Sequence, residues 1–129
     1  MFMPPCEAVH GGLGGLKREA ALVLASRGGK TAELLPEIDV CRKKGATLIA
    51  VTEKIASTLA QAADIVLALR IGRESDKYNF MATSSFVATI AIFDALLAAL
   101  IEETDYTREM FGLIHPGGAV GDMLKKEKA

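Results

Sequence analysis

The 129-residue sequence has only two cysteines, almost no net charge, and neither an internal repeat nor a low-complexity stretch. Cys6 and Cys41 lack the spacing of metal ligands and follow no secretory signal, which favours free thiols in a reducing cytoplasm over a disulfide. A net charge of −1 gives no electrostatic reason to expect a nucleic-acid partner. We therefore expect a cytoplasmic globular protein, with residues 1–129 as one domain.

Long apolar runs are also scarce, and one segment, residues 83–101, is nearly long enough to cross a bilayer. Asp94 lies at its middle, where a charge would cost about 3 kcal/mol on insertion. Thr83, Ser84 and Ser85 at its start are typical helix caps. We expect a helix in the core or at a subunit interface, and no membrane association.

Three short apolar runs, at residues 21–25, 47–52 and 64–69, are typical of buried parallel strands. Helices are predicted between them, at residues 31–44 and 57–63. Pro36 in the first turns of the earlier helix is tolerated, because a proline needs no helical donor there. This alternation predicts an α/β fold in three layers, a doubly wound parallel sheet.

The segment after the first predicted strand, residues 26–31, has the sequence SRGGKT. It offers hydroxyls, a permissive glycine backbone and a cation where open α/β sheets bind ligands, and freed N–H groups at a helix start suit a phosphate-sized anion. An ordinary strand-to-helix turn explains the segment equally well. GGKT also resembles the end of a nucleotide-binding P-loop, but that pattern requires glycine where Leu24 lies inside the strand.

A few further residues could carry chemistry. His10 lies in a glycine-rich segment, residues 7–15, which we expect to be a loop or a helical turn. Glu74 lies in the most charged run of the chain, which leaves the third predicted strand on the ligand side of the sheet. His115 precedes Pro116 and is held extended. By position alone, residues such as His10 and Glu74 are more often solvated than functional, whereas the proline after His115 fixes the His115 ring.

Several stretches together resemble the sugar isomerase (SIS) domain family: ASRGGKTAE, GATLIAVTEKIASTLAQAADIVL, ATSS and HPGGAVGDML. Within that family, HPGGAVG and the earlier EAVHGGLG are similar to the arabinose-5-phosphate isomerase branch. The resemblance covers nearly the whole chain, residues 5–124. It implies five parallel strands flanked by helices and an aldose–ketose isomerase acting on D-arabinose 5-phosphate and D-ribulose 5-phosphate through an enediol.

The resemblance also implies which residues act. The family's phosphate loop corresponds to Ser26, Gly28, Gly29, Lys30 and Thr31. Gly28 stands where a second serine is usual, and Lys30, where an acid is common, could replace the lost hydrogen bond by its charge. The family's acid, base and polar groups correspond to His10, Glu33, Glu74 and His115, which in an assembled enzyme come from more than one subunit.

The resemblance implies a homo-oligomer, a dimer or a tetramer, and no organic cofactor. Two histidines and two glutamates could also bind zinc, but without local ligand spacing we do not expect a required metal.

One family motif is missing, the glycine-rich G-x-G-K-S-G turn whose lysine serves the active site. The chain therefore resembles a partial SIS domain that lacks the family's first strand and helix, and it has no regulatory CBS domains. Another copy, another chain or the rest of a longer protein would have to cover the sheet edge left open. Two alternatives to an isomerase follow: a non-catalytic sugar-phosphate-binding module that senses or regulates, and a structural remnant that serves only in oligomerisation.

Overall fold

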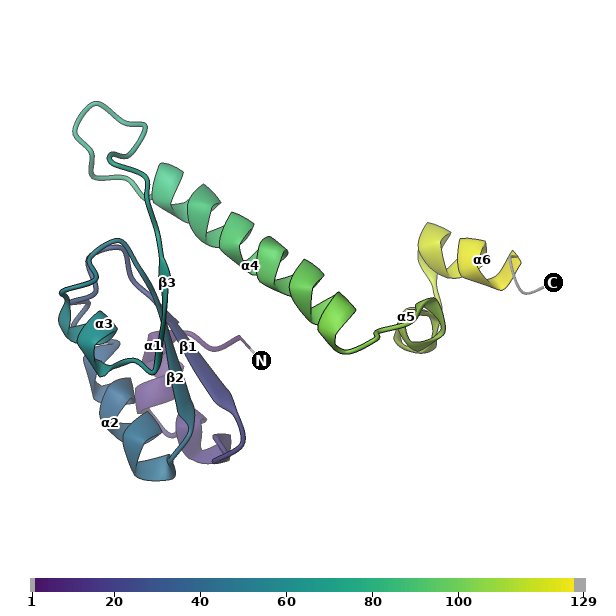
Figure 1. The fold of residues 1–129 in the computed structure, drawn as a ribbon, viewed down its shortest axis with the longest axis horizontal. Coiled ribbons are helices and arrows are strands. Elements are labelled where there is room, and N and C mark those ends of the chain that lie inside the picture. The colour runs from purple at the N-terminus through teal and green to yellow at the C-terminus, as the bar shows by residue number, and fades with distance from the viewer. Residues whose placement is uncertain (1, 127–129) are drawn as a thin grey trace. The chain divides into compact units, whose positions relative to one another are not determined.

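The computed structural model describes residues 2–126, and these fall into two compact units, Met1–Ile90 and Ala91–Ala129. In chain order the elements are α1 (Pro5–Val9), the 3-10 helix η1 (Gly12–Gly15), β1 (Ala21–Ala25), α2 (Leu35–Lys44), β2 (Thr47–Thr52), α3 (Thr58–Ala62), β3 (Ile65–Ala68), α4 (Ser84–Glu103), α5 (Arg108–Ile114) and α6 (Gly118–Lys126) (Figure 1).

The first unit is built on a parallel sheet in the order β1-β2-β3. Ala21 pairs with Thr47 at one end of the sheet, and Thr52 pairs with Ala68 at the other. The bounds of β1 and β2 coincide with the predicted strands, and β3 is one residue shorter at each end. The predicted α/β class with a parallel sheet is confirmed.

Helices α2 and α3 pack against one face of this sheet (Figure 1). The core between them consists of buried residues from the strands, the two helices and their connections: Leu24, Leu34, Ile38, Cys41, Ala46, Leu48, Ala50 and Leu59. Side chains alternate between the faces of a strand, so Val23, Ile49 and Val51 belong to the opposite face, where Val23 and Ile49 are partly buried and Val51 is fully buried. The main core cluster lies on the α2 and α3 side of the sheet.

Both cysteines are free, as predicted. Cys6 is exposed, whereas Cys41 is fully buried in α2 and its Sγ donates to the Ala46 carbonyl at 3.3 Å. Burial raises the pKa of the Cys41 thiol, which keeps it protonated. Cys41 is thus a packing residue.

The predicted start of the helix at Thr31 is wrong. Residues 32–34 form a turn, in which the Leu34 amide donates to the Thr31 carbonyl at 3.0 Å, and α2 begins only at Leu35. Pro36 then lies in the first turn, where its missing N–H costs nothing. The helix ends as predicted at Gly45, whose φ is +69°. Residues 26–31 are therefore a loop separated from the helix terminus.

Two further segments are more regular than their composition suggests. The glycine-rich segment around His10 forms the last turn of α1 and then η1. In the second unit, the proline and glycines near residue 116 interrupt the helices only between α5 and α6. Gly121 allows α6 to pack closely there, because a Cβ at this position would lie 2.8 Å from the His115 carbonyl oxygen.

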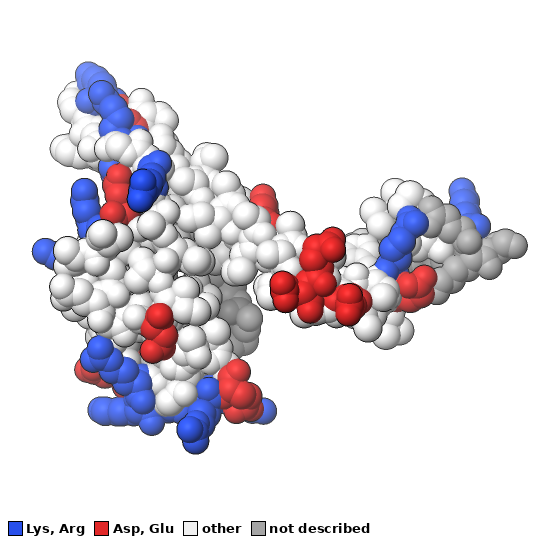
Figure 2. Space-filling view, in the orientation of Figure 1, with Lys and Arg blue, Asp and Glu red and all other residues white. Residues whose placement is uncertain are grey.

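Helix α4 is the longest element, and Ser85 is its only buried residue. By length and composition it could cross a membrane, the one such helix within residues 2–126. Its large apolar side chains are largely exposed; near its start these are Phe86, Val87 and Ile90. Figure 2 shows mostly uncharged surface along this helix. Of the two predicted alternatives, the core helix is therefore wrong for this chain, and the helix at a subunit interface stays a prediction.

Candidate functional site

The carboxyl ends of the three strands meet at one edge of the sheet, because all three strands are parallel. Residues 26–31, which we call the glycine loop, follow β1. Glu53 follows β2, and residues 69–83, the β3–α4 loop, follow β3. Most of the residues that the sequence singled out for binding or catalysis lie in these segments.

The glycine loop is closed by hydrogen bonds from its own first residue. The Ser26 amide donates to the Val51 carbonyl at 2.9 Å, and the Gly29 amide donates to the Ser26 hydroxyl at 3.1 Å. The hydroxyls of Ser26 and Thr31 lie 2.7 Å apart and bond to each other. Ser26 and Thr31, two of the predicted phosphate-binding residues, therefore lie side by side where the glycine loop begins and ends.

Gly29 fixes the shape of this loop. Its φ is +64°, and a Cβ at this position would overlap the Ser57 side chain. Ser57 is buried and caps α3 by accepting from the Ala60 amide at 3.3 Å, while the Leu59 amide donates to the Gly29 carbonyl at 3.1 Å. The glycine loop thus packs against the start of α3, and only glycine fits at position 29.

The rest of the loop is open to a ligand. Gly28 has nothing within 4 Å of the position of an added Cβ, and Lys30 is exposed. Within the described chain, the amides of Gly28, Lys30 and Thr31 donate no hydrogen bond, and Lys30 forms no ion pair. Free amides, two hydroxyls and one cation around a single turn are a suitable set of donors for an anion.

The Thr52 hydroxyl faces the back of the loop. It donates to the Arg27 carbonyl at 3.0 Å and accepts from the Lys54 amide at 3.2 Å. The Glu53 amide also donates to the Arg27 carbonyl, at 3.1 Å. The end of β2 therefore supports the glycine loop through its backbone.

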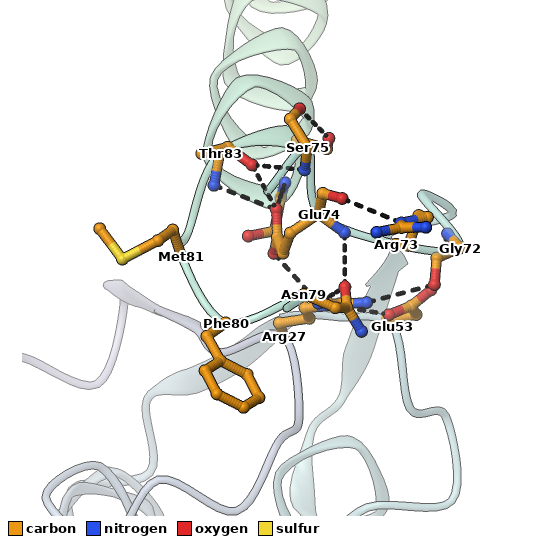
Figure 3. A network of polar contacts seen from close by, with 12 residues as sticks. Arg27, Glu53, Gly72, Arg73, Glu74, Ser75, Asn79, Phe80, Met81 and Thr83 are labelled. Atoms are coloured by element: carbon orange, nitrogen blue, oxygen red, sulfur yellow. Dashed lines mark hydrogen bonds and ion pairs between the residues drawn. The ribbon is translucent and has the colours of Figure 1, made fainter. Parts of the chain in front are cut away.

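The Arg27 side chain joins the segments that follow all three strands (Figure 3). Its Nε donates to Glu53 Oε2 at 2.9 Å, and its Nη1 donates to Glu74 Oε1 at 3.1 Å and to Asn79 Oδ1 at 3.3 Å. Its Nη2 donates to the Gly72 carbonyl at 3.3 Å. The hydrogen bond from Arg27 lowers the pKa of Glu53.

Glu74 lies at the centre of the β3–α4 loop, and only 3% of its surface is exposed. Its Oε2 accepts from the Thr83 amide at 3.0 Å, the Thr83 hydroxyl at 3.2 Å and the Ser85 amide at 3.0 Å. Hydrogen bonding from Ser85, followed by that from Thr83, lowers the pKa of Glu74 to about 2 against the opposing effect of burial. Glu74 is thus an ionised carboxylate that caps the start of α4.

The other three candidate acid–base residues are more open. His10 is exposed at the end of α1, and Glu33 is exposed in the turn before α2. In the described part of the first unit, no hydrogen bond or ion pair links His10, Glu33 and Glu74 to one another. His115 belongs to the second unit, where it ends α5 and stacks on Phe111 with ring centroids 5.1 Å apart.

No group of three or more His, Cys, Asp or Glu side chains within residues 2–126 is arranged to hold a metal ion.

Three residues of this site were not identified from the sequence: Arg27, Glu53 and Asn79. Arg27 and Glu53 could have been found, because each lies within two residues of a predicted strand's carboxyl end and they carry opposite charge. Asn79 has a φ of 62°, and its Oδ1 accepts from the Glu74 amide at 2.6 Å. Nothing in the local sequence indicated this contact.

An open parallel sheet with a free-amide loop after its first strand defines a class of α/β proteins that bind anionic ligands at the carboxyl edge. Comparison with known proteins identifies the family within this class. The SIS domain profile matches residues 2–99, and the chain belongs to the SIS domain family. The resemblance stated from the sequence motifs is confirmed.

Several relatives are named as arabinose 5-phosphate isomerases. KdsD of Pseudomonas aeruginosa is 37% identical over 123 residues, and KdsD of Escherichia coli K12 is 36% identical; each alignment covers 95% of this chain. The chain spans 38% of the length of these two relatives.

Solved structures agree on the fold. A Listeria monocytogenes protein provisionally named as a sugar-phosphate isomerase has a TM-score of 0.86 and 47% identity, covering 91% of this chain and 61% of that one. The Escherichia coli CFT073 protein c3406, solved in complex with A5P, has a TM-score of 0.85 and 34% identity, covering 90% and 62%.

Proposed function

We propose that this chain is the sugar-phosphate-binding part of an aldose–ketose isomerase that interconverts D-arabinose 5-phosphate and D-ribulose 5-phosphate. The observation that carries the proposal is the glycine loop, where amides of Gly28, Lys30 and Thr31 have no partner within the described chain. The names of the relatives, and the A5P bound to one of them, support this choice of substrate.

The phosphate group would bind in the glycine loop. It would accept hydrogen bonds from the free amides and from the hydroxyls of Ser26 and Thr31, which would turn from each other toward the ligand. Lys30 would supply the opposite charge, since Arg27 is engaged by two carboxylates.

Isomerisation moves protons within the sugar. A base removes the proton from C2 of the aldose while O1 takes a proton, which gives the enediol; the enediol then loses its O2 proton and takes a proton at C1, which gives the ketose. The overall change is redox-neutral, so the proposed reaction needs no organic cofactor. His10, Glu33 and His115 are exposed groups that could carry these protons, whereas ionised Glu74 would fix the geometry of the site.

We also infer that the working site is assembled from more than one copy of the chain. The support is the exposed apolar surface of α4, which a second copy would cover. The SIS domain, residues 1–129 in this proposal, would then act in a dimer or a tetramer.

The proposal is tested by incubating the protein with arabinose 5-phosphate in D2O and following the C2 proton by NMR. We expect exchange of this proton together with ribulose 5-phosphate formation. Ser26→Ala and Thr31→Ala should each weaken sugar-phosphate binding by roughly 3–10-fold, the loss of one hydrogen bond. Thr47→Ala, at the opposite edge of the sheet, is the matched control.

A second function is favoured by Gly28, which stands where a second serine is usual in the family's phosphate loop. In this alternative the chain binds a sugar phosphate without converting it, as a sensor or regulatory module. Tight binding of arabinose 5-phosphate without exchange of its C2 proton would support this alternative and would contradict the proposed isomerase function. Unchanged binding in both alanine variants would contradict the phosphate site of either function.

A further inference from the structure

We propose that Arg27 is a positioning residue that sets the distance between the phosphate-binding glycine loop and the β3–α4 loop. This inference rests on the proposed function only in assigning the phosphate to the glycine loop. Arg27 lies within that loop, yet its side chain is directed away from it toward the segments after β2 and β3 (Figure 3).

Both ends of this connection are fixed. At the backbone end, the Arg27 carbonyl accepts from the Thr52 hydroxyl at 3.0 Å and from the Glu53 amide at 3.1 Å. At the side-chain end, the guanidinium uses four of its five N–H donors on Glu53, Glu74, Asn79 and Gly72. Glu53 Oε1 accepts in turn from the Gly72 amide at 3.2 Å, which closes the connection onto the β3–α4 loop.

The charges make this connection hard to replace. One guanidinium lies between two carboxylates, Glu53 and Glu74, whose side chains are 14% and 3% exposed. Without Arg27 the two carboxylates would lose their shared cation, and the β3–α4 loop would lose its ties to the glycine loop. Lysine restores the charge but not the fork of donors that reaches several acceptors at once.

The consequence for catalysis is geometric. A sugar phosphate held by its phosphate still needs its distant C1 and C2 atoms aligned with groups elsewhere at the carboxyl edge. Because Arg27 spans the loops after all three strands, it decides whether the phosphate end and the reacting end are correctly spaced. Small misplacements of this kind reduce turnover far more than binding.

The experiment compares Arg27→Met and Arg27→Lys with the wild-type chain, and Arg70→Met serves as the matched control. Arg70 is exposed and has no ion pair or hydrogen bond within the described residues. The measurements are kcat and KM for arabinose 5-phosphate, the Kd of inorganic phosphate, and hydrogen exchange of the amides in residues 74–83.

We expect Arg27→Met to lower kcat on the order of 10²-fold while the Kd of inorganic phosphate changes less than about 2-fold. Amide exchange in residues 74–83 should also become faster in Arg27→Met. Arg27→Lys should recover part of each change, because it keeps the charge. Arg70→Met should behave like the wild type. In the double variant Arg27→Met/Glu53→Gln the loss of kcat should be no larger than in Arg27→Met alone, because both changes break the same contact between Arg27 and Glu53.

Other outcomes overturn the inference. If Arg27→Met weakens the binding of inorganic phosphate as much as the binding of the sugar phosphate, Arg27 is a phosphate ligand. If kcat and amide exchange are both unchanged in this variant, Arg27 does not position the β3–α4 loop. A wild-type chain without turnover would contradict the proposed function instead, and amide exchange would still test Arg27. Should Arg27→Met not fold, Glu53→Gln weakens the same connection from its other side and should also speed the exchange.

Discussion

Gly28 and Gly29 are neighbours in the glycine loop but differ in their surroundings. Gly29 has a left-handed φ of +64° and lies against the Ser57 side chain, whereas an added Cβ at Gly28 would meet nothing within 4 Å. The fold therefore requires glycine at position 29, whereas it leaves room for a side chain at position 28.

Serine at these two positions should have opposite effects. Gly29→Ser should destabilise the chain by about 2 kcal/mol or more, because it combines backbone strain with overlap at Ser57. Gly28→Ser should fold normally and bind a sugar phosphate roughly 3–10-fold more tightly, since it adds the hydroxyl that the family usually has there. Urea denaturation and titration calorimetry measure the two effects. Equal destabilisation by both changes would contradict this view of the loop.

At the scale of elements, the start of α4 depends on a residue outside the helix. Glu74 accepts hydrogen bonds from the amides of Thr83 and Ser85, and the negative charge is favourable at a helix N-terminus. The sequence predicted capping by the hydroxyls of residues 83–85, but a carboxylate 10 residues before Ser84 satisfies these amides. Glu74 therefore joins the β3–α4 loop to the first turn of the helix.

The pKa of Glu74 makes this element sensitive to acid. Its folded value is about 2, below the unfolded value of about 4.3, so the stability that it contributes is present above the unfolded pKa. That contribution is lost as pH falls from about 5 toward 2. Glu74→Gln should be less stable than the wild type at pH 7, and the difference should shrink over this range. Urea denaturation at several pH values measures it, and a pH-independent difference would contradict the prediction.

At the scale of the whole molecule, the first unit's part of α4 exposes three large apolar side chains, Phe86, Val87 and Ile90. Contiguous apolar surface of this kind usually marks an interaction site. The family resemblance implies oligomers, and we propose that this surface is covered by a second copy.

A charge at the centre of this surface should prevent association. We expect the wild-type chain to sediment as a dimer or a tetramer and Phe86→Glu to shift toward the monomer, because the change removes about 1.5–3 kcal/mol of apolar burial per side chain. Gln61→Glu places the same charge on exposed α3 and should leave the oligomer intact. A monomeric wild-type chain would contradict the prediction and would also exclude a purely oligomerising role.

The sequence by itself determined the local features of this protein. The apolar runs gave β1 and β2 with their observed bounds, Gly45 ended α2, and the cysteine spacing predicted free thiols. The motifs in residues 25–33 and 45–67 indicated the SIS family, whose profile matches residues 2–99. These features follow from periodicity, turn chemistry and short-range spacing, which act within a few residues of the chain.

Tertiary structure decided what the polar residues do. Arg27 meets Glu53 across 26 residues and Glu74 across 47, so no local pattern shows that the loop's arginine is engaged away from a phosphate. The ionisation of Glu74 likewise depends on a hydrogen bond from the Ser85 amide of α4. The start of α2 at Leu35 depends on the turn that precedes Pro36. A side chain's charge and hydrogen-bonding state is set by its neighbours in space, and only the folded chain brings those neighbours together.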